Sequence, residues 1–141
     1  MVEIDEVARI MREVAAVEIL PRWRNLGSED VVEKTSPGDI VTVADRAAEE
    51  HLSRRLADLL PGSHVVGEEA IHADPAIARH FASGAPVWVI DPIDGTSAFA
   101  SGEPGFAVMV ALVMGEELIG GWILAPVSGE IHMVERGAGV W

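Results

Sequence analysis

The sequence has no cysteine among its 141 residues. Disulfide bridges, thiol nucleophiles and zinc–thiolate sites are therefore excluded. It is also poor in positive charge, because 10 Lys and Arg stand against 23 Asp and Glu, which gives a formal net charge of −13. Nucleic acids and anionic membrane surfaces require a positive protein face, so neither is an expected partner. The acidic balance suits a site that divalent cations neutralise, although it also serves simple solubility.

Targeting and membrane segments are missing as well. The N-terminal residues 1–6 are acidic, whereas a secretory signal begins with basic residues. Glycine or charge interrupts every long apolar run before it reaches membrane-spanning length. We therefore expect a cytoplasmic protein. The length predicts one domain, or one piece of a larger chain.

Two amphipathic helices are predicted within the first 60 residues. Apolar residues recur every three or four positions over about residues 3–20. Thr42 and Asp45 have the spacing of a capping box, which predicts a second helix from there to about Leu60. A shorter helix is expected over about 75–81, where Asp-Pro marks a helix start.

Short apolar runs predict strands at 31–34, 64–67, 87–90, 106–114, 118–124 and 130–135. Short turns join the last three runs, a pattern typical of an antiparallel meander rather than of repeated βαβ units. Two helices followed by a meander predict an α+β fold, with the helices layered on the sheet.

Carboxylates follow two of these strands. Asp91 and Asp94 end the third predicted strand, and Glu68 and Glu69 end the second. Because successive strands often lie side by side, Glu68, Asp91 and Asp94 are expected to converge. Crowded carboxylates repel one another unless cations lie among them, and Mg²⁺ prefers oxygen ligands. The dipeptides Asp-Pro and Asp-Gly are also common in ordinary polar turns, so a capped turn is the alternative.

The segment Asp91-Pro92-Ile93-Asp94-Gly95-Thr96-Ser97-Ala98-Phe99 resembles the signature of the inositol monophosphatase family, which are Mg²⁺-dependent, lithium-sensitive phosphomonoesterases. Other segments match that family in the same order, namely 34–39, 41–45, 67–69, 105–108 and 137–141. Several ordered motifs across nearly the whole chain are more specific than any one alone. The implied fold is the N-terminal half of the family's αβαβα-layered sugar-phosphatase fold. Residues 1–141 would then be a metal-binding N-terminal domain, truncated before a C-terminal α/β domain.

The resemblance implies a set of metal ligands. A first Mg²⁺ would be held by Glu68, Asp91 and the backbone carbonyl of Ile93. Asp91 would also bridge to a second ion, which it would share with Asp94. The family resemblance implies two or three Mg²⁺ ions per site, with Mn²⁺ as a possible substitute and Li⁺ as an inhibitor.

The resemblance also implies how a small phosphorylated substrate would be hydrolysed. The phosphate would be contacted by Glu68, Ile93, Asp94, Gly95 and Thr96. Gly95 and Thr96 would use their backbone N–H groups. A water activated by the metal would attack phosphorus in line, and Thr96 and Glu68 would position and deprotonate it. Asp45 would orient Thr96. Relatives are commonly homodimers, so a second copy of the chain is the expected protein partner.

Several assignments stay open. Glu69 is either a residue that supports the metal ligands or a solvated turn acid. Lys34 resembles a family lysine near the phosphate, and an exposed lysine without that role is the alternative. Ala98 replaces the family's usual asparagine. A further Asp ligand and most substrate-selecting residues would lie in the missing half. The ester therefore stays open among inositol phosphate, histidinol phosphate, fructose bisphosphate and 3′-phosphonucleotide.

Two other interpretations compete with this one. A haloacid-dehalogenase-type phosphatase also ends a strand in Asp-Gly-Thr, but one residue separates its aspartates, whereas two separate Asp91 from Asp94. That fold also needs parallel βαβ units, while this sequence predicts a meander. The second rival is a non-catalytic fragment that binds metal or dimerises without turnover.

Overall fold

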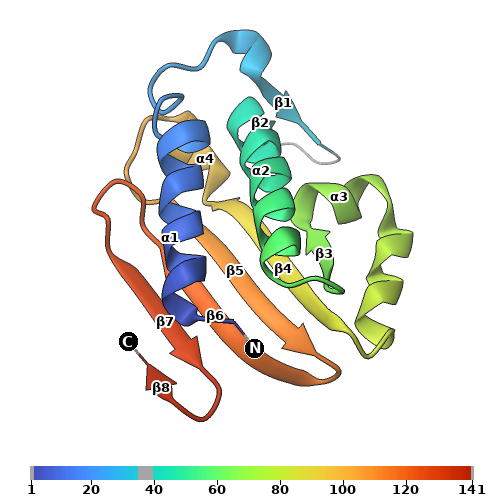
Figure 1. Ribbon diagram of the computed structural model, residues 1–141. Helices are drawn as coiled ribbons and strands as arrows, with labels where there is room; N and C mark the ends of the chain where they lie inside the picture. Colours follow the sequence, from blue (N-terminus) through green and yellow to red (C-terminus); the bar gives the residue numbers. More distant parts are fainter. Residues whose placement is uncertain (1, 35–39, 141) are drawn as a thin grey trace.

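The computed structural model describes residues 2–34 and 40–140. Two long helices, α1 (Ile4–Val14) and α2 (Val43–Leu59), lie across one face of a six-stranded sheet (Figure 1). The predicted α+β arrangement, with two N-terminal helices layered on a sheet, is confirmed. No helix in the described ranges is long and apolar enough to cross a membrane. The predicted turn at 36–39 and the terminal Trp141 lie outside the described residues.

The strand order in the main sheet is β3-β4-β5-β6-β7-β8. Their bounds are β3 His64–Gly67, β4 Pro86–Asp94, β5 Ala107–Met114, β6 Glu117–Leu124, β7 Ile131–Glu135 and β8 Gly139–Val140. Every pair from β4 onward is antiparallel, which confirms the meander. β3, however, runs parallel to β4, so the sheet is mixed rather than purely antiparallel.

The crossover from β3 to β4 contains a helix that the sequence analysis did not predict. Glu68 and Glu69, expected at the end of a strand, instead begin α3 (Glu68–Ala73). The 3₁₀ helix η3 (Pro75–Ala82) follows where a short helix was expected. A helix of six residues is too short to show hydrophobic periodicity, so tertiary contacts must define it.

The remaining elements are short. β1 (Val31–Glu33) and β2 (Ile40–Thr42) form a separate antiparallel pair that leads into α2. α1 continues as a π-helical turn, η1 (Ala15–Ile19), and the 3₁₀ turn η2 (Ser28–Asp30) precedes β1. α4 (Thr96–Ala100) follows β4 directly.

The core lies between the two helices and the sheet. Its fully buried members include Met11 of α1, Leu52 and Leu56 of α2, and Trp88 of β4. Trp122 of β6 packs 6.0 Å from Trp88 between ring centroids and donates its indole N–H to the carbonyl of Ile4, at 3.0 Å. Each such buried side chain contributes about 1.5–3 kcal/mol, so this layer fixes how α2 lies over β4.

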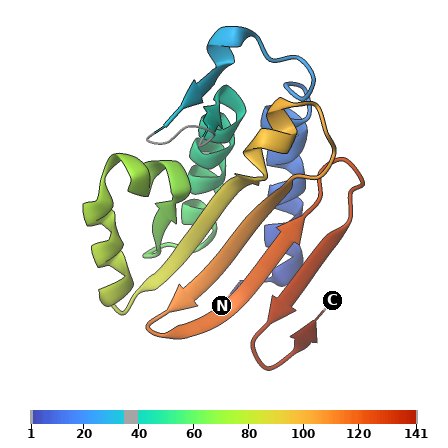
Figure 2. The ribbon, with the colours of Figure 1, turned by 180° about the vertical axis from the view of Figure 1, so that it is seen from behind.

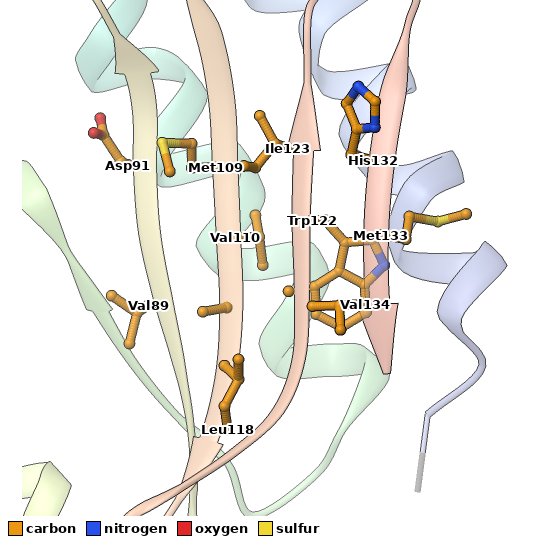
Figure 3. A pocket seen from close by; sticks show the side chains of 12 residues that line it. Val89, Asp91, Met109, Val110, Leu118, Trp122, Ile123, His132, Met133 and Val134 are labelled. Atoms are coloured by element: carbon orange, nitrogen blue, oxygen red, sulfur yellow. The ribbon is translucent and has the colours of Figure 1, made fainter. Parts of the chain in front are cut away.

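The other face of the sheet is apolar and is open among the described residues (Figure 2). Because side chains alternate along a strand, Trp88 and Ile90 of β4 face the helices while Val89 and Asp91 face away. Figure 3 shows this surface, which we call the open face; its defining side chains are Val89, Asp91, Met109, Leu118, Ile123 and Val134. Leu118 is 49% exposed and Ile123 is 45% exposed. Asp91 thus lies at one end of an unusually apolar exposed surface.

Candidate active site

The end of β4 is shaped into an acidic turn. The pairing of β4 with β5 shifts register between Asp91 and Asp94, so the strand is irregular there. Gly95 follows with φ +89°, in the left-handed region that favours glycine. A Cβ at this position would also lie 3.1 Å from the carbonyl oxygen of Gly105. Both constraints require glycine at the turn between the carboxylates and α4.

The parallel pairing of β3 with β4 brings the two acidic segments to one edge of the sheet. Gly67 is paired with Ile90, so the residues that follow each of them, Glu68 and Asp91, are neighbours. Glu68 is accordingly one of the groups that raise the pKa of Asp91. The expected adjacency of the two strands is confirmed, whereas the convergence of Glu68, Asp91 and Asp94 on a metal ion stays a prediction.

Asp91 is the most perturbed acid of the cluster. Burial, the hydrogen bond with Glu68, and the negative charges of Glu68, Asp94 and Asp45 together raise its pKa from 3.8 to about 8. Its Oδ1 is buried and has no hydrogen-bond partner in the part of the chain that the structure describes. A buried carboxylate oxygen without a donor needs either a proton or a cation.

This donor set fits a hard divalent cation in its chemistry, since carboxylates of Glu68, Asp91 and Asp94 and a backbone carbonyl are all oxygen ligands. Within residues 2–34 and 40–140, however, no three His, Cys, Asp or Glu side chains are already arranged to hold a metal ion. Asp94 is exposed. The carboxylates are therefore neighbours whose side chains must reorient to bind an ion.

Asp45 connects α2 to the acidic turn. It is fully buried at the start of α2, where its Oδ2 accepts hydrogen bonds from the backbone N–H (2.8 Å) and the hydroxyl (2.6 Å) of Thr42. This confirms the predicted capping box. Its Oδ1 lies 2.9 Å from the Thr96 hydroxyl, which also lies 3.0 Å from the carbonyl oxygen of Ile93. Burial raises the pKa of Asp45, and the hydrogen bonds from Thr42 and Thr96 oppose that rise.

The Thr96 hydroxyl has one proton and two acceptors in reach. It can donate to Asp45 or to the carbonyl of Ile93, but not to both fully. When the hydroxyl donates to Asp45, the Ile93 carbonyl oxygen no longer accepts its proton. That carbonyl oxygen and a lone pair of the hydroxyl can then accept other partners at the acidic turn. Asp45 and Thr96 are therefore in contact, and the orienting role that the resemblance implies for Asp45 stays a prediction, as do the catalytic roles.

Lys34 and Glu69 lie beside the same cluster. The Lys34 ammonium is 3.3 Å from Glu68 Oε1 and 3.5 Å from Glu69 Oε1, and the Lys34 side chain is only 8% exposed. The alternative of an exposed lysine is therefore wrong. Burial raises the pKa of Glu69, and the charge of Lys34 opposes that rise. Lys34 thus offsets part of the cluster's negative charge.

One residue of this region was missed by the sequence analysis. Glu49 lies one helical turn after Asp45 on α2 and is 6% exposed. Its two carboxylate oxygens accept the backbone N–H groups of Glu69 and Ala70, each at 2.8 Å. Burial raises the pKa of Glu49, and these two hydrogen bonds oppose that rise. The only signal in the sequence was its spacing of four from Asp45, which places both acids on one helix face.

Known proteins are similar in sequence to this chain along nearly its whole length. The inositol monophosphatase family matches residues 2–141. The chain is 38% identical over 113 residues to an inositol-1-monophosphatase of Mycobacterium leprae, a match that covers 80% of this chain and 38% of the relative. It is 30% identical over 141 residues to a fructose-1,6-bisphosphatase/inositol-1-monophosphatase of Thermotoga maritima, covering 100% of this chain and 50% of the relative.

Solved structures agree with these sequence matches. An IMPase of Thermotoga maritima superposes with a TM-score of 0.79 at 27% identity, covering 97% of this chain and 49% of that one. The extragenic suppressor protein suhB of Bartonella henselae gives a TM-score of 0.75 at 28% identity, over 96% of this chain and 50% of that one. This chain therefore spans between 38% and 50% of the length of these proteins.

Proposed function

The chain belongs to the inositol monophosphatase family, and we propose that the complete protein hydrolyses a small phosphate monoester with Mg²⁺ at the Asp91 cluster. The observation that carries this proposal is the buried Asp91 Oδ1, which lacks a partner among the described residues and lies beside Glu68. The curated relatives with this arrangement of segments are inositol-1-monophosphatases by name, and the Thermotoga maritima relative is also a fructose-1,6-bisphosphatase. An inositol-phosphate-like ester is the substrate class that these names support.

The proposed ligands are the side chains of Glu68, Asp91 and Asp94 and the carbonyl of Ile93. Mg²⁺, when bound, supplies Lewis-acid chemistry that offsets the phosphate charge and makes water a better nucleophile. The protein's own contribution is positioning. Asp45 aligns the Thr96 hydroxyl, which would hold the attacking water together with Glu68. The N–H groups of Gly95 and Thr96 would bind phosphate, and Lys34 would limit the cluster's net charge.

We further propose that the functional protein has a second half that covers the open face. Two observations support this: the chain spans only 38–50% of the curated relatives named above, and the sheet face to which Asp91 belongs carries the exposed side chains of Leu118 and Ile123. A contiguous apolar surface of this kind usually marks a contact with another protein surface. A cytoplasmic homodimer is the assembly that the family resemblance predicts.

The decisive experiment combines Mg²⁺ binding, measured by calorimetry, with hydrolysis of inositol 1-phosphate on the same sample. Binding with turnover would support a complete site in this chain. Binding without turnover would support a metal site that needs a second half, which is the non-catalytic alternative for the fragment. Asp91→Asn should remove binding in either case, whereas Asp5→Asn, on the exposed surface of α1, should leave it unchanged. Undiminished Mg²⁺ binding or turnover in Asp91→Asn would contradict the proposal.

A further inference from the structure

Glu49 caps a helix to which it does not belong. A helix N-cap side chain normally accepts the N–H groups of the second or third helical residue. The N-cap of α3 is Gly67, which has no side chain and makes no such bond. The carboxylate of Glu49 reaches across from α2 and accepts both N–H groups instead, those of Glu69 and Ala70. The missing cap is therefore supplied by a different helix, and α2 and α3 lie side by side (Figure 1).

Gly67 provides the space for this contact. Its φ of −95° and ψ of 156° are open to any residue, so the backbone itself does not require glycine. A Cβ on Gly67, however, would overlap the side chain of Glu49. Glycine is therefore required here by the Glu49 carboxylate, which occupies the volume where a local capping side chain would lie.

We propose that Glu49 is a positioning residue that fixes Glu68 against Asp91 by capping α3 from α2. Glu68 is the first residue of α3, directly before the two N–H groups that Glu49 binds. Asp45, one turn earlier on α2, holds Thr96 on the other side of the cluster. One rigid helix therefore sets the separation of α3 from the acidic turn. The inference rests on the proposed function only where Glu68 is taken to bind metal; the capping itself does not depend on it.

The test compares Glu49→Ala with Glu50→Ala in the 141-residue chain. Glu50 is the adjacent residue on α2, exposed, and paired only loosely with Arg54 at 3.8 Å. Glu49→Ala should remove the hydrogen-exchange protection of the Glu69 and Ala70 amides and weaken Mg²⁺ binding by about 10- to 100-fold, the usual effect of losing a residue that orients metal ligands. Glu50→Ala should change neither quantity.

A rescue variant separates positioning from general damage to the fold. Gly67→Ser alone should clash with Glu49, but in the Glu49→Ala background the serine finds empty space and can cap α3 locally, because serine is a strong N-cap residue. The double variant Glu49→Ala/Gly67→Ser should regain amide protection and return Mg²⁺ affinity to within about threefold of wild type. Recovery of overall melting temperature without recovery of affinity would overturn the proposal.

The outcomes distinguish this inference from the proposed function. If Asp91→Asn abolishes Mg²⁺ binding while Glu49→Ala leaves both affinity and amide protection unchanged, the positioning role is wrong and the function stands. If Glu49→Ala loses amide protection but keeps full affinity, capping is real and its role in the metal site is refuted. If the wild-type chain binds no Mg²⁺ at all, the proposed metal site and the role of Glu49 in it both fail.

Discussion

Replacing Asp91 with asparagine should make the metal-free protein more stable, although Asp91 is the carboxylate at the centre of the candidate active site. The pKa of Asp91 rises from 3.8 to about 8 in the folded protein. Between these values the folded protein keeps a proton that the unfolded chain has released. The free energy of unfolding of wild type therefore falls as pH rises from about 4 to about 8. Asparagine cannot ionise, so the variant escapes this loss.

The size of the effect follows from the same values. Each pKa unit corresponds to about 1.4 kcal/mol, so the gap between 3.8 and about 8 sets a ceiling of about 5–6 kcal/mol at pH 8. Solvent reaches part of the Asp91 side chain and screens its charge, so we expect about 2 kcal/mol. For a domain of this size that is a rise in melting temperature of about 6 °C. Near pH 4 the two proteins should melt together.

The assay is thermal unfolding in EDTA at several pH values, repeated with Mg²⁺. Wild type should gain about 1.4 kcal/mol when Mg²⁺ is at ten times its dissociation constant, and Asp91→Asn should gain almost nothing. The exposed Asp5→Asn variant should follow wild type throughout. A lower melting temperature for Asp91→Asn in EDTA at pH 8, or a difference that does not grow with pH, would refute the reasoning.

Three further predictions concern the scaffold around the cluster. Gly95→Ala should lower the free energy of unfolding by about 1–2 kcal/mol in a urea titration, because alanine is strained at φ +89° and meets the Gly105 carbonyl. Asp45→Asn should cost about 1–2 kcal/mol in the same titration and lower turnover of the complete protein more than its Mg²⁺ affinity, because an amide cannot accept from Thr42 and Thr96 with both ends. Ile123→Lys, on the open face, should leave the melting temperature of the 141-residue chain unchanged but reduce its self-association in light scattering.

The fold could be predicted largely because its signals are local. The apolar spacing over 3–20 and the Thr42–Asp45 capping box identified both long helices, and short apolar runs identified every strand except the short β2 and β8. What local pattern could not supply was α3. Its six residues carry no periodicity, and its N-cap is a glycine, which has no side chain to cap the helix. The side chain that caps it is that of Glu49, which is 20 residues before Glu69 in the sequence. Contacts of that kind depend on how α2 lies over the sheet, which no window of sequence contains.

In the candidate site, too, some features could be predicted from the sequence and others could not. The resemblance gave Asp45, Thr96, Glu68 and Asp91 roles that require them to be close. The structure joins Asp45 to Thr96 by a hydrogen bond and pairs β3 with β4, so that Glu68 and Asp91 follow neighbouring positions. The state of Lys34 could not be predicted, because its burial depends on the position of α3 and on the acids that α3 presents. The residue types show which chemistry is available at the site. The burial of Asp91 depends instead on neighbours from β3, β4 and α2, and the pKa of Asp91 depends on that burial.

Strand alternation connects the candidate site to the open face. On β4, the same alternation that buries Trp88 and Ile90 beneath the helices places Val89 and Asp91 on the opposite surface. A layer that covered Val89 and Met109 would therefore bury Asp91 further and raise the cost of its negative charge. That cost can be offset by a proton or by a cation bound to the carboxylate. Covering the sheet and binding Mg²⁺ should consequently be coupled, each making the other more favourable, because both act on the charge of Asp91.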